Sequence, residues 1–232
     1  MPKHTLSAYR QGYLALWAAA RIEKVSEARR AAEKILAHAD RYKALERRTG
    51  VPWFAIGVIH MRESNCNFNA VLHNGQPIIG TGHKTTIVPI GRGPFATFEE
   101  AAIDALKDYK GATWDVPQIA FTLESFNGFG YRSKGVPSPY LWGGSSAQKR
   151  GKYVRDGVFD PNVMDSQLGA MTVLRQLCAM DTDVAARIDG KAPAAKPAPV
   201  LPSDLEPVPP RPAPAGVLAT LVSAFLSIFK RS

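Results

Sequence analysis

One glutamate, Glu63, stands where a general acid would be expected. Trp53, Ile56 and Ile59 precede it at the spacing of one helical face, so Glu63 is predicted to share their apolar side. Turn formers follow at 64–67, which places Glu63 near the end of that helix. Partial burial and the negative end of the helix dipole both raise a carboxyl pKa. A carboxylic acid that is still protonated near neutral pH can donate its proton to a glycosidic oxygen.

Two other interpretations of the acidic residues remain open. Glu63 can pair with Arg62 or with a distant arginine, which would make it a structural ion pair at a helix end. Glu124, on a second predicted helix over 114–126, is a rival acid. Its neighbours Thr122 and Ser125 indicate an exposed face, so Glu63 is the preferred candidate.

A metal centre is the third interpretation of this region. Five potential ligands are close in sequence: His60, Glu63, Cys66, His73 and His83. Their spacing is not the His-Glu-x-x-His pattern of zinc hydrolases, and most fall on separate turns. We therefore expect neither a metal nor a cofactor.

Several short segments carry a resemblance to a known family. Glu63-Ser64 with Phe68 is similar to the Glu-Ser-x-x-Asn-Phe signature of the lysozyme-like superfamily, which contains goose-type lysozymes, lytic transglycosylases and phage endolysins. The segment 126–131, Phe-Asn-Gly-Phe-Gly-Tyr, is similar to the Tyr-Asn-Gly motif of that superfamily. Segments 59–64, 72–75 and 138–142 together resemble endolysin-like lysozymes of bacteriophages and prophages. The resemblance covers roughly residues 40–180, by the order and spacing of several motifs.

The resemblance implies a mainly helical, lysozyme-like α+β fold with one small β-hairpin beside the active-site cleft. It implies a muramidase that cleaves the β-1,4 bond between N-acetylmuramic acid and N-acetylglucosamine in peptidoglycan, with Glu63 as general acid. The Gly-Leu-Met-Gln segment of lytic transglycosylases is absent, and for this reason we prefer a hydrolase. Phe126 replaces the usual tyrosine, and a lytic transglycosylase remains the alternative. A cell-wall-binding or virion structural protein without activity is the competing class.

The hairpin is expected over Pro77–Pro89, where β-branched residues alternate with glycine turns. An inverting hydrolase needs a second group that holds water on the opposite face of the sugar. No aspartate or glutamate occurs between Ser64 and Phe98. His73 and Thr85, with the neighbouring threonine at 86, are the candidates for that role.

Substrate-binding residues are predicted in the aromatic segments that follow. Asn127 can hydrogen-bond an N-acetyl group, and the glycine-rich stretch that ends at Tyr131 allows a close approach of the backbone to a ligand. Tyr140, Trp142 and Tyr153 offer flat faces for sugar rings. Ordinary packing is the alternative for each ring.

Residues 1–190 are predicted to form the catalytic domain, of which 1–48 would be an N-terminal scaffold of one or two amphipathic helices. A helix is predicted after Thr97, with its acidic residues on a solvated face. A buried helix is predicted over 163–180. Cys66 and Cys178 are expected to be small core residues, since two cysteines are too few for a disulfide framework.

The C-terminal region has a different composition. Nine of the 18 prolines fall after residue 191, so 191–215 is predicted to be a Pro/Ala-rich linker. Residues 216–232 are mainly apolar and end in Lys230, Arg231 and a serine. About fifteen residues of helix span roughly 22 Å, less than the roughly 30 Å of a bilayer core. We expect a short helix that lies on an anionic membrane surface; packing against its own domain is the alternative.

The net charge of +9 points to an anionic partner. Lys and Arg are dispersed and form no recognised nucleic-acid motif, so peptidoglycan is favoured over nucleic acid. The apolar stretch at 14–20 is too short for a signal peptide. We therefore expect a monomer that is made in the bacterial cytoplasm and acts on the cell wall after release.

Overall fold

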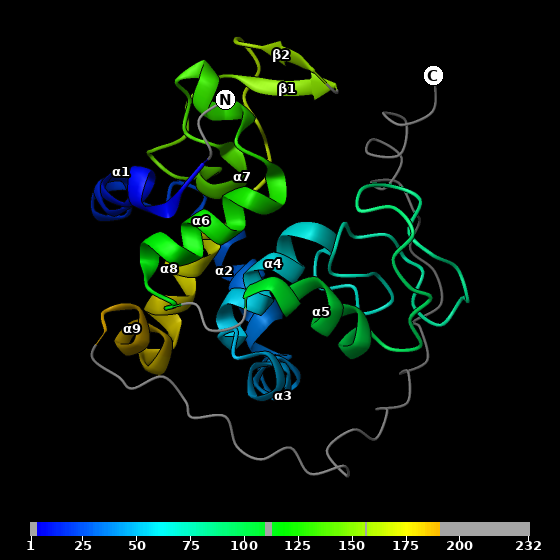
Figure 1. Cartoon of the computed structure of the whole chain (residues 1–232). Coiled ribbons are helices and arrows are strands. Elements are labelled where there is room, and N and C mark those ends of the chain that lie inside the picture. Colours follow the sequence, from blue (N-terminus) through cyan, green and yellow to red (C-terminus); the bar gives the residue numbers. More distant parts are fainter. Residues whose placement is uncertain (1–3, 110–112, 156, 191–232) are drawn as a thin grey trace.

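The computed structural model describes residues 4–109, 113–155 and 157–190. It is mainly helical (Figure 1). The α-helices in these ranges are α1 (Leu6–Ala19), α2 (Val25–Leu36), α3 (Ala39–Thr49), α4 (Trp53–Ser64), α5 (Phe98–Leu106), α6 (Val116–Asn127), α7 (Pro139–Trp142), α8 (Ala170–Met180) and α9 (Thr182–Ile188). Short 3-10 helices cover Lys107–Tyr109 (η1) and Gly130–Lys134 (η2). The mainly helical class expected from the sequence is therefore confirmed. The predicted linker and terminal helix at 191–232 lie outside the described residues.

Local signals define several helix ends. Thr97 and Glu100 form a capping box at the start of α5, and the Asp115 side chain caps α6. Gly50 ends α3 in the left-handed conformation at φ 74°. The N-terminal scaffold contains three helices where one or two were expected, because two short breaks divide it. The helix expected over 163–180 begins only at Ala170.

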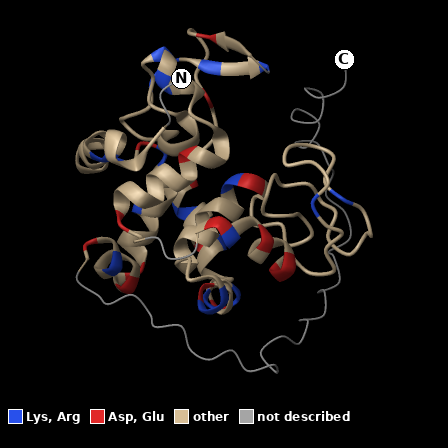
Figure 2. Cartoon of the chain, viewed as in Figure 1, with Lys and Arg blue, Asp and Glu red and all other residues tan. Residues whose placement is uncertain are grey.

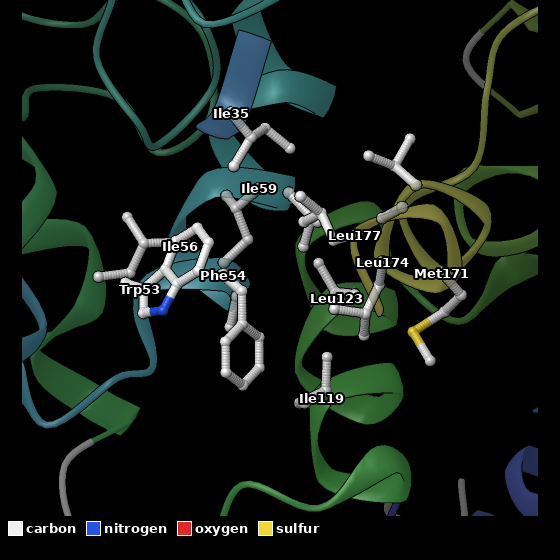
Figure 3. Packing of buried hydrophobic residues seen from close by; sticks show 14 of the residues in the cluster. Ile35, Trp53, Phe54, Ile56, Ile59, Ile119, Leu123, Met171, Leu174 and Leu177 are labelled. Atoms are coloured by element: carbon white, nitrogen blue, oxygen red, sulfur yellow. The ribbon is translucent and has the colours of Figure 1, made fainter. Parts of the chain in front are cut away.

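Helix α4 runs through the centre of the protein. Every residue from Trp53 to His60 is buried, and the helix packs against α2, α3 and α8. Figure 3 shows its side chains among those of α6 and α8, including Ile119 and Leu174. The sequence predicted one apolar face for this helix, whereas this part of α4 is buried on every side, as is typical of a helix packed from several directions. Only its last turn reaches the surface.

The expected hairpin over Pro77–Pro89 does not form. The chain there consists of turns and bends, and side chains take up the backbone groups: the Gln76 amide oxygen accepts from the backbone N–H groups of Thr86 and Ile87. Proline has no N–H to donate to a strand ladder, which disfavours regular pairing in this segment. The segment from Asn65 to Thr97 is instead a long ordered loop at the right of Figure 1.

A small antiparallel sheet forms elsewhere. Strands β1 (Lys152–Arg155) and β2 (Val158–Asp160) pair with Lys152 opposite Asp160 and Tyr153 opposite Phe159. Figure 1 shows this hairpin at the top of the molecule, away from the 65–97 loop. None of the helices in the described ranges has the length and apolarity needed to cross a bilayer.

Candidate active site

Glu63 lies in the last turn of α4, where the helix leaves the core. Its side chain is half-buried, whereas the helix is fully buried up to His60. Asn65 ends the helix in the left-handed conformation at φ 56°. The glutamate is thus built on a rigid central helix but retains access to solvent.

Within the described residues, the Glu63 carboxyl group has one hydrogen-bonded partner, the phenol of Tyr140 on α7. The Tyr140 hydroxyl donates to Oε1 of Glu63 over 2.6 Å. No ion pair joins Glu63 to a lysine or arginine in the described part of the chain. Arg62 instead donates to the Leu168 carbonyl over 3.3 Å and lies over the Tyr140 ring at 4.8 Å. The helix-end ion pair considered from the sequence is not observed.

This environment changes the acidity of Glu63. Burial penalises the anion and raises the pKa of the Glu63 carboxyl to about 7, although the Tyr140 hydrogen bond and the Arg62 charge act in the opposite direction. A substantial fraction of the molecules therefore carry a neutral carboxylic acid at neutral pH. That is the protonation state a general acid requires.

His60 holds the turn that follows the acid. It is fully buried, and its Nδ1 and Nε2 atoms lie 2.8 Å from the Tyr42 hydroxyl and 3.1 Å from the Asn67 carbonyl. Burial lowers the pKa of His60 to about 4, so the ring is neutral. It donates to the carbonyl through Nε2 and accepts from the phenol through Nδ1. Both ring nitrogens are occupied, and His60 is a structural residue.

The turn at 71–76 packs directly against the backbone of Glu63. A Cβ atom at Gly75 would lie 2.2 Å from the Glu63 carbonyl oxygen, and Gly75 has φ 73°. Only glycine fits both the space and the conformation. The His73-Asn74-Gly75 segment singled out in the sequence therefore supports the acid-bearing helix from outside.

His73 makes its contacts with α5. Its Nε2 lies 2.9 Å from Oδ2 of Asp104, which also binds Arg92 and Lys107. Burial lowers the pKa of His73, against the effect of Asp104, and the Arg92 hydrogen bond holds the pKa of Asp104 well below its usual range. The expectation that Asp104 faces solvent was wrong, because the 65–97 loop folds over it. No hydrogen bond joins His73 to Glu63 in the described residues.

Thr85 forms hydrogen bonds with the backbone of its own loop. It is 2% exposed, its hydroxyl donates to the Pro89 carbonyl, and the same oxygen accepts from the Arg92 backbone N–H over 2.9 Å. Of the two candidates for orienting water, Thr85 is thus engaged inside the loop. His73 is bound to Asp104 on α5 through Nε2, and its buried Nδ1 has no hydrogen-bond partner in the described residues.

The predicted substrate-binding residues lie in different surroundings. Asn127 is exposed at the end of α6. Tyr131 is buried, and its oxygen accepts from the Tyr153 backbone N–H over 3.2 Å, while Tyr153 is half-buried with its ring 5.1 Å from that of Tyr131. Trp142 is 2% exposed in the core and offers no open ring face. The Tyr140 hydroxyl contacts Glu63, and the position of Tyr140 in the sequence does not indicate this contact.

The rival acid Glu124 is only 2% exposed, so the expectation that it faces solvent was wrong. It accepts hydrogen bonds from the Tyr13 hydroxyl and from Arg132, each at 2.5 Å. Its neighbours Thr122 and Ser125 satisfy their hydroxyls within the helix: Thr122 accepts from Gln118, and Ser125 donates to the Thr122 carbonyl. The polar neighbours of Glu124 therefore did not indicate that Glu124 is exposed.

Among the described residues, no group of three or more His, Cys, Asp or Glu side chains is arranged to hold a metal ion. Cys66 and Cys178 are both free and half-buried. In the described residues, Lys and Arg occur on several helices and loops (Figure 2).

Comparison of the chain with protein-family models, with curated proteins and with solved structures finds no match in any of the three. In the part of the chain that the structure describes, the architecture is mainly α with one small antiparallel sheet. The candidate site is a half-buried carboxyl group at the end of a central helix.

Proposed function

We propose that the protein is a peptidoglycan-degrading endolysin of the lysozyme type, which cleaves the β-1,4 bond between N-acetylmuramic acid and N-acetylglucosamine. The observation that carries the proposal is the state of Glu63: half-buried, without a cationic partner in the described residues, and with its pKa raised to about 7. The substrate is inferred from the resemblance of the motifs around Glu63 to those of the lysozyme-like superfamily. A general acid of this kind needs neither a metal nor a cofactor.

In the proposed reaction, neutral Glu63 donates its proton to the glycosidic oxygen as the bond to the sugar carbon breaks. The carboxylate that remains keeps the hydrogen bond from Tyr140, and the Arg62 charge also favours it. If the enzyme is a hydrolase, a water molecule then attacks the sugar carbon and loses one proton to solvent, and Glu63 regains a proton from solvent.

Lytic transglycosylation is the second candidate, and one observation favours it. His73 and Thr85 are engaged with Asp104 and with backbone groups of their own loop. Thr85 therefore has no free hydroxyl for the water-holding role, and His73 offers only its Nδ1, which is buried without a hydrogen-bond partner in the described residues. In a transglycosylase the C6 hydroxyl of the muramyl sugar takes the place of water, so no such residue is needed.

We further propose that the enzyme acts as a monomer on the cell wall after release from the cytoplasm. The segment 216–232 would add contact with an anionic membrane surface. Removal of 191–232 should then leave wall cleavage in solution intact and abolish binding to anionic vesicles. Equal vesicle binding by the truncated chain would assign that binding to the basic domain instead.

The central test compares Glu63→Gln with Glu124→Gln on purified cell walls. Gln keeps the shape of Glu63 but cannot donate the acid proton, so we expect cleavage to fall about 10²- to 10⁴-fold. Glu124→Gln, assayed below its unfolding temperature, should retain cleavage because Glu124 is paired with Arg132. Near-parental activity of Glu63→Gln would falsify the acid assignment.

The reaction products separate the remaining candidates. Mass spectrometry of released fragments should show reducing muramic acid ends for a hydrolase and anhydromuramic acid ends for a transglycosylase. A non-catalytic wall-binding protein would release no sugar, and Glu63→Gln would bind walls as well as the parent.

A further inference from the structure

Tyr140 is held rigidly where α7 packs against the start of α8. In the short helix α7, Tyr140 is 6% exposed. The chain after it is fixed by a close backbone contact, since the Gly169 N–H donates to the Gly143 carbonyl over 2.8 Å. A Cβ atom at Gly169 would lie 2.2 Å from the Leu141 carbonyl oxygen, so the two segments pack without space between them. The phenol therefore has little freedom to move.

Arg62 holds the Tyr140 ring from another direction. Its guanidinium carbon lies 4.8 Å from the ring centre, and its Nη1 donates to the Leu168 carbonyl over 3.3 Å. A cation over an aromatic face is attracted to the ring electrons. The arginine that precedes the acid in sequence thus orients the tyrosine that binds the acid.

The Tyr140 hydroxyl has one acceptor in the described residues, Oε1 of Glu63 at 2.6 Å. Neutral Glu63 has a single proton, which is carried by one of its two oxygens. Because Oε1 already accepts the phenol proton, the acid proton of Glu63 is favoured on Oε2. No hydrogen bond or ion pair within the described ranges occupies Oε2.

We propose that Tyr140 is a positioning residue that directs the acid proton of Glu63 onto Oε2 and stabilises the carboxylate left after proton transfer. The inference rests on the proposed role of Glu63 as general acid. The proton moves from Oε2 to the glycosidic oxygen, and the negative charge that appears on Glu63 strengthens the hydrogen bond from Tyr140 to Oε1. This role differs from the sugar stacking expected from the sequence.

The first test measures Glu63 without any substrate. Tyr140→Phe removes the hydroxyl but keeps the ring that Arg62 covers. The hydrogen bond favours the carboxylate, so its loss should raise the pKa of Glu63 further. Titration of the Glu63 side-chain carboxyl by carbon NMR, assigned with Glu63→Gln, should place the parent near 7 and Tyr140→Phe at a higher pH.

Tyr13→Phe is the matched control, because the Tyr13 hydroxyl donates to Glu124 in the same way. It should leave the titration of Glu63 unchanged, even if the protein unfolds at a lower temperature. An unchanged or lower Glu63 midpoint in Tyr140→Phe would overturn the proposal. The same holds if Tyr13→Phe moves that midpoint as far as Tyr140→Phe does.

The second test uses activity against pH. The parent should lose cleavage as pH rises through about 7, because Glu63 must be protonated. In Tyr140→Phe this limb should move to higher pH, and the maximal rate should fall roughly tenfold as the carboxylate loses a charge-assisted hydrogen bond. If the NMR midpoint shifts but the parent shows no cleavage, the positioning of the Glu63 proton stands and the proposed function fails.

Discussion

Glu63 and Glu124 have similar positions on their helices and similar hydrogen-bond partners. Each lies near the C-terminal end of a helix, α4 or α6, and each accepts a hydrogen bond from a tyrosine hydroxyl, at 2.6 Å from Tyr140 and 2.5 Å from Tyr13. They differ in charge compensation and exposure. Glu124 is buried beside Arg132, whereas Glu63 is half-buried without a salt bridge in the described residues.

The difference shows how the same residue type serves two purposes. At Glu124 the arginine compensates the carboxylate, and the pair joins η2 to α6, with Arg132 also lying 3.5 Å from the Tyr9 ring centre on α1. At Glu63 nothing in the described chain compensates the charge fully, so burial favours the neutral acid. The lack of a salt bridge in the described residues, not burial alone, distinguishes the candidate acid from Glu124.

The largest effect on stability is expected from breaking the buried pair. Arg132→Met leaves the Glu124 carboxylate buried without its cation, and loss of one partner of such a pair costs about 3 kcal/mol. Urea denaturation at pH 7 measures the change in the free energy of unfolding. A loss below about 1 kcal/mol would mean that solvent screens the pair, and the contrast with Glu63 would lose its basis.

A smaller effect of opposite sign is expected at Glu63. Its pKa is about 7 in the fold and 4.5 in the unfolded chain, so folding carries no penalty below pH 4.5 and an increasing one as pH rises to 7. Linkage over this pKa difference gives at most about 3 kcal/mol, and the solvent access of the half-buried side chain reduces it. Glu63→Gln should therefore stabilise the protein by about 2 kcal/mol at pH 8 and by little at pH 4. Thermal unfolding at the two pH values measures this.

Glu124→Gln is the control for that experiment. It should lower the unfolding temperature at pH 8, because it leaves Arg132 without its carboxylate. If Glu63→Gln also lowers stability at pH 8, the Glu63 carboxylate is not penalised by the fold, and the two sites are alike.

The smallest effect is expected at an exposed ion pair. Arg29 and Glu33 lie one turn apart on α2, with side chains 68% and 52% exposed. Arg29→Gln should cost no more than about 0.5 kcal/mol, and high salt should remove even that. If Arg29→Gln lowers the free energy of unfolding as much as Arg132→Met does, burial does not determine how much these two ion pairs contribute to stability.

Much of the helical architecture could be predicted because it depends on nearby residues. Apolar residues at three- to four-residue spacing indicated α4, and Thr97 with Glu100 marked the start of α5. The 77–89 segment was predicted wrongly, because glycine and β-branched residues suit both a hairpin and a loop. His73 and Arg92, which flank this segment, both bind Asp104 on α5. Gln76 binds the backbone of Thr86 and Ile87, so contacts outside the local pattern hold the loop.

The candidate site was only partly predictable for the same reason. The sequence by itself determined that Glu63 ends an apolar helix and that turn formers follow it, since both features arise within a few residues. Only the tertiary structure decided which group binds each carboxyl: Tyr140 is 77 positions from Glu63, and Tyr13 is 111 positions from Glu124. A carboxyl pKa depends on burial and on the charges around the group, and these come from residues distant in the chain.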